Sequence, residues 1–408
     1  MEPSTAFVWI WLPDAHEPVV AGRLDRRGQT TVFTYGQSYL HRQNRIALFL
    51  PELPLVGGPQ LPRAGEIAGC IADAGPDAWG RRVIENRHLG AGAEEFADLG
   101  LLAYLLESGS DRIGALDFQT SASTYTAREA GDATLAELLE SAERVENGVA
   151  LSPVVDRALL HGSSVGGARP KALLANGPRR VIAKFSSTTD AYPVVKGEFI
   201  AMELARRVGL DVASTELVHV LGKDVLLIDR FDRTAHGTRR AMVSVLTVLG
   251  LDEMGGRYAS YADLADVIRA RFTDSERTLH ELFSRITFNI LCGNNDDHAR
   301  NHAAFWDGTS LTLTPAYDIC PQPRSGQETA QIMAIGRDGF RMSQVAGCVA
   351  NAAIYHLTSS QAREVVDHQI DLIRSNWLDV CDVAALSQTD RARFWQSQFL
   401  NPYATYGY

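Results

Sequence analysis

The sequence has no long hydrophobic run, because no stretch of its 408 residues approaches 18 uninterrupted apolar positions. A membrane-spanning helix needs about 20 such residues. The apolar segment Phe7–Leu12 is far too short to cross a bilayer and has no basic region before it. It therefore predicts a buried strand rather than a signal peptide, and we expect no membrane partner for this chain.

Cysteine is also scarce. The five cysteines are odd in number, scattered along the chain and without any Cys-x-x-Cys pair: Cys70, Cys292, Cys320, Cys348 and Cys381. This usage predicts a reduced, cytoplasmic setting. Each cysteine is expected to be a small core residue rather than a metal ligand or a nucleophile.

Positive charge is in deficit, since the formal net charge is -10. This balance works against direct, non-specific DNA binding, which needs a surplus of Lys and Arg to displace counterions. The candidates for a small local basic patch are Arg81, Arg82 and Arg87. Hydrophobic residues make up 45% of the chain and charged residues 22%, which indicates a globular protein with a large core. At roughly 100–200 residues per domain, the length predicts two or three domains.

Short apolar runs separated by turn residues predict a small antiparallel sheet near the N-terminus, with strands at Phe7–Leu12, Glu17–Leu24 and Thr30–Tyr35. The next elements expected are two helices and a returning strand, at Pro76–Arg87, Glu94–Glu107 and Gly109–Phe118. The polar stretch 120–132 marks a boundary, after which a helix over Ala133–Glu146 opens the next unit.

Two hairpins around one helix are predicted next. The strands Lys171–Ala175 and Arg180–Phe185 flank an Asn-Gly pair, which is the strongest short hairpin signal. The helix and the second hairpin are expected at Glu198–Val208, Thr215–Val220 and Asp224–Asp229. Beyond residue 240 helices dominate, and one of them has apolar residues at steps of three and four: Leu279, Leu282, Phe283, Ile286 and Ile290.

The predicted fold class is therefore α+β. We expect a β-rich N-terminal subdomain over residues 1–125, a small α+β lobe over residues 126–236, and a mostly helical C-terminal lobe over residues 237–408.

The first cluster that carries chemistry follows the predicted helix. Asp296 and Asn301 stand in an Asp-x-x-x-x-Asn arrangement, the spacing of the catalytic loop of protein kinases. In such a loop the aspartate accepts the proton of the attacking hydroxyl, and the asparagine holds magnesium. The spacing alone is weak evidence, because polar loops after helices are common.

A second aspartate supports the same interpretation. Asn301–Trp306 and Thr309–Thr314 flank Asp-Gly and predict a β-hairpin, which leads to Asp318. In protein kinases a hairpin separates the catalytic loop from a second magnesium-binding aspartate. Here Asp-Ile-Cys replaces Asp-Phe-Gly, so only the carboxylate role is expected. The alternative is that Asp318 caps a helix.

Two further features favour nucleotide binding. Lys184 ends a β-branched strand, the pattern that sets an ammonium group against the α- and β-phosphates, with Glu198 or Glu203 as its ion-pair partner. The segment 162–171 is rich in Gly and Ser and ends on Lys171, so its backbone amides could approach phosphates. It matches neither generic nucleotide motif, and a flexible linker is the alternative.

A zinc site is the competing interpretation of the polar cluster. His298 and His302 are four residues apart and could share a helical face as metal ligands. The glutamate of His-Glu-x-x-His is missing, because Ala299 occupies its position, and the strand-like run after His302 disfavours a helix.

Four motifs together resemble the HipA family of toxin kinases, and they lie at residues 164–171, 181–185, 296–301 and 313–318. The segment 229–233 looks like the hinge of that family, whose backbone meets the adenine, and Gly22-Arg23-Leu24 and Pro76–Gly80 fit its N-terminal part. The resemblance covers nearly the whole chain and implies a protein-kinase-like, two-lobed fold. Residues 240–250 depart from the family pattern.

The resemblance implies ATP and magnesium as cofactors and a role for each matching residue. Asp296 would be the catalytic base, Asn301 and Asp318 would hold magnesium, and Ser164, or its neighbour Ser163, would be autophosphorylated. The residues implied in ATP binding are Gly166, Gly167, Ala168, Lys171, Lys184, Asp229, Phe231 and His298.

The resemblance also implies partners. A small helix-turn-helix antitoxin from the same operon would bind the chain and provide its only, indirect, contact with DNA. The protein substrate would be a translation component such as an aminoacyl-tRNA synthetase. The alternative function is a catalytically silent kinase fold that acts as a co-repressor with the antitoxin, and a metallohydrolase is the third.

Overall fold

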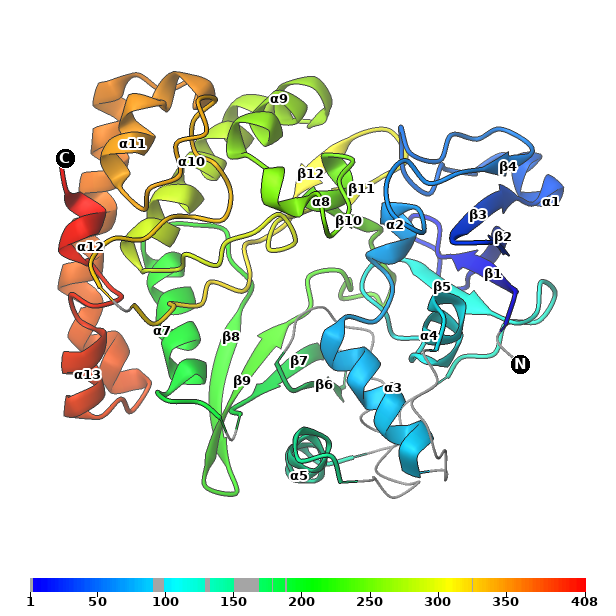
Figure 1. Cartoon of the computed structure of the whole chain (residues 1–408), viewed down its shortest axis with the longest axis horizontal. Helices are drawn as coiled ribbons and strands as arrows, with labels where there is room; N and C mark the ends of the chain where they lie inside the picture. Colours follow the sequence, from blue (N-terminus) through cyan, green and yellow to red (C-terminus); the bar gives the residue numbers. More distant parts are fainter. Residues whose placement is uncertain are drawn as a thin grey trace. The chain divides into compact units, whose positions relative to one another are not determined.

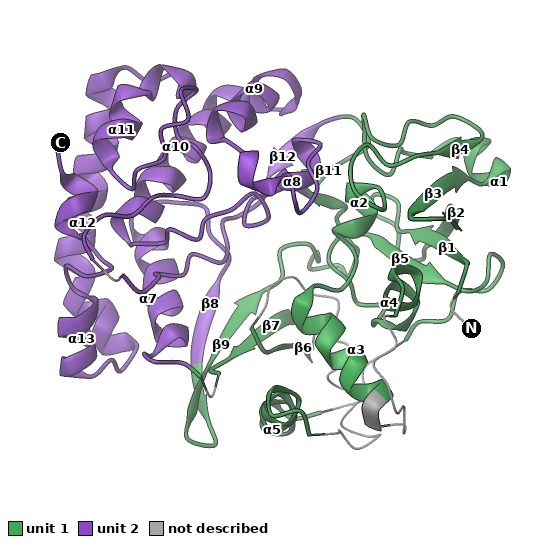
Figure 2. Ribbon diagram, viewed as in Figure 1, with its two compact units in different colours: residues 1–189, 218–243, 305–309 green, residues 190–217, 244–304, 310–408 purple. Residues whose placement is uncertain are grey.

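The structure is a computed structural model, and it describes residues 3–90, 99–128, 133–149, 169–177, 179–187, 189–324 and 326–408. The chain forms two compact units (Figure 2). Unit 1 comprises residues 1–189, 218–243 and 305–309, and unit 2 comprises residues 190–217, 244–304 and 310–408. Both helices and strands are abundant, which confirms the predicted α+β class. The three sequence domains stay a prediction.

The first sheet of unit 1 is five-stranded, in the order β4-β3-β2-β1-β5. Its strands are β1 (Thr5–Ile10), β2 (Val19–Arg27), β3 (Thr30–Tyr35), β4 (Pro59–Gln60) and β5 (Leu116–Gln119). Gly28, in the turn between β2 and β3, has a φ of 63°, a conformation that favours glycine. Gly22 is required by packing, because a Cβ there would lie 2.3 Å from the Thr34 carbonyl oxygen.

The predicted strand over Gly109–Phe118 is wrong in its first part, since β5 begins only at Leu116. The preceding segment is a loop held by arginine side chains instead of a strand ladder. The Ser110 carbonyl accepts a hydrogen bond from Arg239 Nη1 at 3.0 Å, and the Arg112 carbonyl accepts one from Arg230 Nη2 at 2.7 Å. A sequence pattern cannot show that side chains from elsewhere satisfy these backbone groups.

The helices of unit 1 are α1 (Gln37–Leu40), α2 (Gly69–Ala72), α3 (Ala78–Gly90), α4 (Leu101–Glu107) and α5 (Leu135–Glu146). Of the two helices expected between residues 76 and 107, both are present, although residues 91–98 lie outside the described part of the chain. Helix α5 begins at a capping box, in which Thr134 and Glu137 bond each other's backbone.

The second sheet has the order β6-β7-β9-β8, with β6 (Lys171–Asn176), β7 (Arg179–Phe185), β8 (Thr215–Val220) and β9 (Lys223–Asp229). Both predicted hairpins are therefore present. One face of β6, β7 and β9 packs against helices α3 and α5, which lie beside these strands in Figure 1. The apolar side chains of that core are Ala172, Ala183, Phe185 and Val225 with Trp79, Val83, Leu138 and Leu139.

Unit 2 is mostly helical, with α7 (Val194–Arg207), α8 (Val245–Val248), α9 (Tyr261–Arg271), α10 (Ser275–Leu291), α11 (Val345–Ala350), α12 (Ser359–Val383) and α13 (Gln388–Phe394). Three 3-10 turns occur at Gly256–Tyr258, Ala352–Tyr355 and Pro402–Thr405. A three-stranded sheet has the order β10-β11-β12, from β10 (Met242–Ser244), β11 (Ala303–Trp306) and β12 (Leu311–Leu313).

Helix α10 positions the polar cluster. The predicted apolar face is buried along its length. The helix ends at Leu291, Cys292 is its C-cap, and Gly293 follows with a φ of 74°. A Cβ on Gly293 would lie 2.6 Å from the Gln398 carbonyl oxygen, so only glycine fits this exit. The chain then turns directly into the loop that contains Asp296.

All five cysteines are free, and four of them are buried, as expected for core residues. Among the helices in the described ranges, none is both long and apolar enough to cross a membrane.

Candidate active site

The loop between α10 and β11 presents the candidate base and one candidate magnesium ligand. Asp296 is exposed on this loop, whereas Asn301 is buried. Asn301 Nδ2 donates a long hydrogen bond of 3.4 Å to the main-chain oxygen of Asp296. Because this bond uses the nitrogen end of the amide, the amide oxygen is the end that can face a cation.

Asp318 lies close enough to Asp296 to change its electrostatics. Partial burial raises the pKa of Asp296, the negative charges of Asp318 and Asp297 raise it further, and His298 opposes them. Asp318 itself has a φ of 59°, a left-handed conformation that is uncommon outside glycine and often marks a functional site. The structure therefore brings Asp296, Asn301 and Asp318 together within unit 2.

The donor set fits magnesium. Carboxylate and amide oxygens are hard ligands, and Mg²⁺ usually binds one or two carboxylates while it keeps water and phosphate oxygens. Within the described ranges, no group of three or more His, Cys, Asp or Glu side chains is arranged to hold a metal ion. Asn301, Asp318 and the phosphates of a nucleotide would have to complete the coordination.

The zinc interpretation has no support in this geometry. His302 is buried, and its Nε2 lies 3.0 Å from Asp297 Oδ2. His298 is instead partly exposed and interacts with Asp296. The two imidazole rings thus lie in different surroundings. The segment between them is a loop, whereas a metal site on a shared helical face requires a helix.

The segment 240–250, which departs from the family pattern, supports the loop through its backbone. The Val245 amide donates to the His302 carbonyl at 2.8 Å, and the Leu246 amide donates to the Ala299 carbonyl at 3.2 Å. These hydrogen bonds are made by backbone groups and not by side chains. A segment whose sequence departs from the family pattern can therefore still make them.

In unit 1, strands β6 and β7 place Lys171 directly opposite Lys184. Opposed residues of antiparallel strands lie on the same face, about 5 Å apart. Both lysine side chains are buried, with exposed fractions of 1% and 9%. Buried lysines are costly unless anions compensate their charges, so two of them on one face of a sheet are suited to bind phosphate groups.

Asp77 provides part of that compensation, a role that no sequence motif predicted. Its Oδ2 lies 3.3 Å from Lys171 Nζ, and its Oδ1 accepts from the Gly80 amide at the start of α3. Burial raises the pKa of Asp77, while Lys171 and the Gly80 amide act against that rise. The adjacent Trp79 donates from Nε1 to the Lys171 carbonyl at 3.0 Å.

The candidate hinge follows β9. Arg179 Nε lies 2.5 Å from Asp229 Oδ1, and the Phe231 ring packs edge-on against Phe305 with centroids 5.9 Å apart. The intervening Arg230 is buried and donates from Nη2 to Asp232 Oδ2 at 2.7 Å. The hinge is thus fixed by its own charged side chains.

An ionic network extends from the hinge to the loop before β5. Arg230 and Arg233 both contact Asp111, and Asp232 also accepts from the Gly114 amide at 2.8 Å. Burial opposes ionisation of Asp232, but the two arginines keep the pKa of Asp232 below its usual value.

The two glutamates proposed to pair with Lys184 differ in their surroundings. Glu203 already binds Arg206 and Arg207 on its own helix, at 2.7 and 3.0 Å. Glu198 is buried on the same helix. The remaining predicted positions, Ser163, Ser164, Gly166, Gly167 and Ala168, lie outside the described residues.

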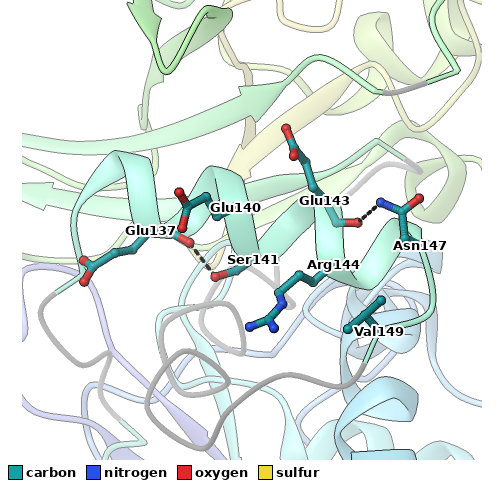
Figure 3. Close-up of a pocket in the computed structure, with 7 residues that line it drawn as sticks. All are labelled: Glu137, Glu140, Ser141, Glu143, Arg144, Asn147 and Val149. Atoms are coloured by element: carbon teal, nitrogen blue, oxygen red, sulfur yellow. Dashed lines mark hydrogen bonds between the residues drawn. The ribbon is translucent and has the colours of Figure 1, made fainter.

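A separate cavity of about 360 Å³ lies along α5 (Figure 3). Its lining is largely charged and comes from Glu137, Glu140, Ser141, Glu143, Arg144, Asn147 and Val149. None of the predicted catalytic or nucleotide-binding residues lines it.

Comparison with known families gives a direct match. The family model described as HipA-like C-terminal domain matches residues 163–377, and that described as HipA N-terminal domain matches residues 11–119. The chain belongs to the HipA family. The first match includes both lysines, the candidate hinge and the loop with Asp296, and the second covers strands β2, β3, β4 and β5 of the five-stranded sheet but begins after β1.

Among relatives of this HipA-family chain, the serine/threonine-protein kinase toxin HipA of Shewanella oneidensis is 27% identical over 183 residues. That alignment covers 38% of this chain and 42% of the relative. The chain spans between 33% and 44% of the length of four curated relatives.

A solved structure supports the fold. This structure contains HipA, HipB and operator DNA from Shewanella oneidensis, and the match covers 97% of this chain and 95% of that chain, with a TM-score of 0.71 and 20% identity. The kinase-like α+β fold predicted from the resemblance is thereby confirmed.

Proposed function

We propose that this chain is an ATP- and magnesium-dependent serine/threonine protein kinase that acts as the toxin of a toxin–antitoxin pair. The observation that carries the proposal is the grouping of Asp296, Asn301 and Asp318 in unit 2, with the pKa of Asp296 raised. A base that is more basic than an ordinary carboxylate suits the removal of a proton from a hydroxyl.

The reaction would be phosphoryl transfer. The acceptor serine or threonine oxygen forms a bond to the γ-phosphorus of ATP. At the same time the bond breaks between that phosphorus and the oxygen that bridges the β- and γ-phosphates. ADP leaves with the electron pair of the broken bond, and the hydroxyl proton passes to the carboxylate of Asp296. Positioning and electrostatic stabilisation supply most of the rate in this chemistry. His298 would contact the nucleotide from the same loop.

Magnesium would be held by Asn301 and Asp318, and it would neutralise charge on the β- and γ-phosphates. Lys171 and Lys184 would bind phosphate oxygens, because they are paired across β6 and β7 and buried. The ion-pair partner of Lys184 would be Glu198 or Glu203, the two candidates that the sequence offers.

The Gly-rich loop and the hinge would complete the nucleotide site. Gly166, Gly167 and Ala168 would offer backbone amides to the phosphates. The backbone around Asp229 and Phe231 would meet the adenine. Ser164, or Ser163 beside it, would be the autophosphorylated residue.

The biological partners follow from the family. We propose a small helix-turn-helix antitoxin that links the chain to operator DNA, since the structural relative is a complex of HipA, HipB and operator DNA. The substrate would be a component of translation, such as an aminoacyl-tRNA synthetase, in the cytoplasm. Co-expression with the neighbouring small reading frame, followed by co-purification, tests the antitoxin.

The activity is tested by incubating the purified chain with γ-labelled ATP, magnesium and a generic serine-containing protein acceptor. Transfer of label in the wild type, and its loss in Asp296→Asn, is the expected result. A chain that binds the antitoxin and represses the operon, yet transfers no label with or without magnesium, would instead establish the silent co-repressor.

A further inference from the structure

A buried polar network lies directly under the loop that carries Asp296. Its centre is Asp297, whose side chain is 2% exposed. One oxygen, Oδ2, is contacted by three groups: Tyr261 Oη at 2.5 Å, Asn289 Nδ2 at 2.8 Å and His302 Nε2 at 3.0 Å. The donors come from the first residue of α9, from α10 and from the end of the loop itself.

The network continues to the start of the loop. Asn289 uses both ends of its amide, since its Oδ1 also accepts from Asn294 Nδ2 at 3.0 Å. The Asn289 carbonyl accepts from the Asn294 amide at 2.8 Å. Every member is buried, with exposed fractions of 4% or less. Two helices therefore hold the loop at its beginning, middle and end.

The anchor points lie next to the residues proposed for chemistry. Asp297 follows the candidate base, and His302 follows the candidate magnesium ligand Asn301. A shift of Asp297 or His302 would therefore move both of these residues. Displacement of a catalytic group by about 1 Å can cost 100-fold in rate.

Stability does not explain why a charge is kept here. A buried carboxylate is costly to desolvate, and well-packed apolar residues often replace such groups without loss of stability. Burial raises the pKa of Asp297, but His302 and the hydroxyl of Tyr261 outweigh it and lower the pKa overall. Three hydrogen bonds converge on Asp297 in a low-dielectric interior and restrain the groups attached to it, although two buried atoms of the network, Asn294 Oδ1 and His302 Nδ1, have no hydrogen-bond partner in the described residues.

We infer that Asp297, held by Tyr261, Asn289 and His302, is a positioning residue that sets the geometry of Asp296 and Asn301 for phosphoryl transfer. This inference rests on the proposed kinase function. It assigns no contact with substrate to Asp297, and the network acts only through the loop.

The chain offers a matched pair of substitutions. Tyr261→Phe removes the hydroxyl that donates to Asp297 and leaves the ring in place. Tyr355→Phe makes the same change in unit 2 at a buried tyrosine whose hydroxyl has no hydrogen-bond partner in the described residues. A second pair is His302→Gln, which keeps an N–H donor, and His302→Leu, which does not.

Two measurements test the inference. Steady-state kinetics give kcat and KM, with kcat calculated from the concentration of folded protein. Amide hydrogen exchange reports how firmly residues 294–302 are held. We expect Tyr261→Phe to lower kcat by about 10- to 100-fold, with KM for ATP unchanged and faster exchange in the loop. His302→Gln should retain most of the kcat that His302→Leu loses. Tyr355→Phe should match the wild type in both measurements.

The inference is overturned if Tyr261→Phe lowers the melting temperature but leaves kcat and loop exchange unchanged, or if Tyr355→Phe has the same effects. A wild-type chain without phosphoryl transfer would instead overturn the proposed function. Loop exchange is independent of activity, so in that case it still decides whether the network holds the loop.

Discussion

At the scale of single residues, Asp296 is notable because its pKa is raised although its side chain reaches the surface of the loop. It combines partial burial with two neighbouring negative charges, Asp297 and Asp318. Perturbed carboxylates of this kind cluster at catalytic sites. Asp318, in its left-handed conformation, adds local backbone strain at the same place.

The first prediction concerns this base. Asp296→Asn should lower kcat for phosphoryl transfer by about 10²–10⁴-fold, because an amide cannot accept the proton. Nucleotide affinity should stay within experimental error of the wild type, since the change is nearly isosteric. Single-turnover transfer and calorimetric titration with ATP measure the two effects. Near wild-type transfer in this variant would show that another group is the base.

The second prediction concerns magnesium. Asp318→Ala and Asn301→Ala should each raise the magnesium concentration needed for half-maximal activity, and Asp318→Ala should do so more strongly because it removes a full charge from a divalent site. Titration of magnesium at saturating ATP is the measurement.

The control for this titration is Asp371→Ala, which removes an equal charge from an exposed position on α12. It should leave the magnesium requirement unchanged. If Asp318→Ala and Asp371→Ala gave superimposable titrations, Asp318 would not be a magnesium ligand.

At the scale of elements, the hinge after β9 is held by the ionic network of Asp111, Arg230, Asp232 and Arg233. Arg230 and Asp232 have side chains exposed by only 1% and 3%. Breaking a buried ion pair by removing one partner is far more costly than losing a surface pair, because the other charge stays buried and uncompensated. This element is therefore rigid for an electrostatic reason.

The third prediction follows from this rigidity. Asp232→Asn should lower the free energy of unfolding by about 3–5 kcal/mol, and it should weaken nucleotide binding because the hinge loses its fixed shape. Asp25→Asn is the control, since Asp25 also binds an arginine in unit 1 but at the surface. That change should cost about 1 kcal/mol or less.

Chemical denaturation and titration with ATP test both variants. A loss of stability in Asp232→Asn without any loss of nucleotide affinity would mean that the network stabilises unit 1 but does not shape the hinge.

At the scale of the whole molecule, the proposed autophosphorylation links the catalytic loop of unit 2 to a serine in the N-terminal half of the chain. A phosphate on Ser164 would add about -1.5 to -2 charges at pH 7. ATP bound as proposed would bring negative charge to the same Gly-rich segment. Repulsion between the two should disfavour nucleotide binding and inactivate the enzyme.

The fourth prediction is that wild-type protein gains phosphate at Ser164, or at Ser163, after incubation with ATP, and loses activity as it does so. Asp296→Asn should gain none. Peptide mass spectrometry beside an activity time course provides the measurement. If the Asp296→Asn protein were modified equally, the phosphate would come from a contaminating kinase.

The sequence by itself determined the local elements and the positions of the candidate groups. The hairpin of β6 and β7 follows from an Asn-Gly pair between two largely apolar runs, and its register then places Lys171 opposite Lys184. Apolar spacing predicted α10, and the Asp-x-x-x-x-Asn spacing predicted the loop beyond it. These features depend on interactions between residues close in sequence, which is why a single sequence reveals them.

Only the tertiary structure decided which charges are buried together. Asp77 and Lys171 are 94 positions apart, Asp111 and Arg230 are 119 apart, and Tyr261 and Asp297 are 36 apart. No local pattern marks such partners, because the strength of a charged contact depends on which distant segments exclude water from it. The loop sequence placed Asp296 and Asn301 at the candidate site, but the fold decided how firmly they are held there.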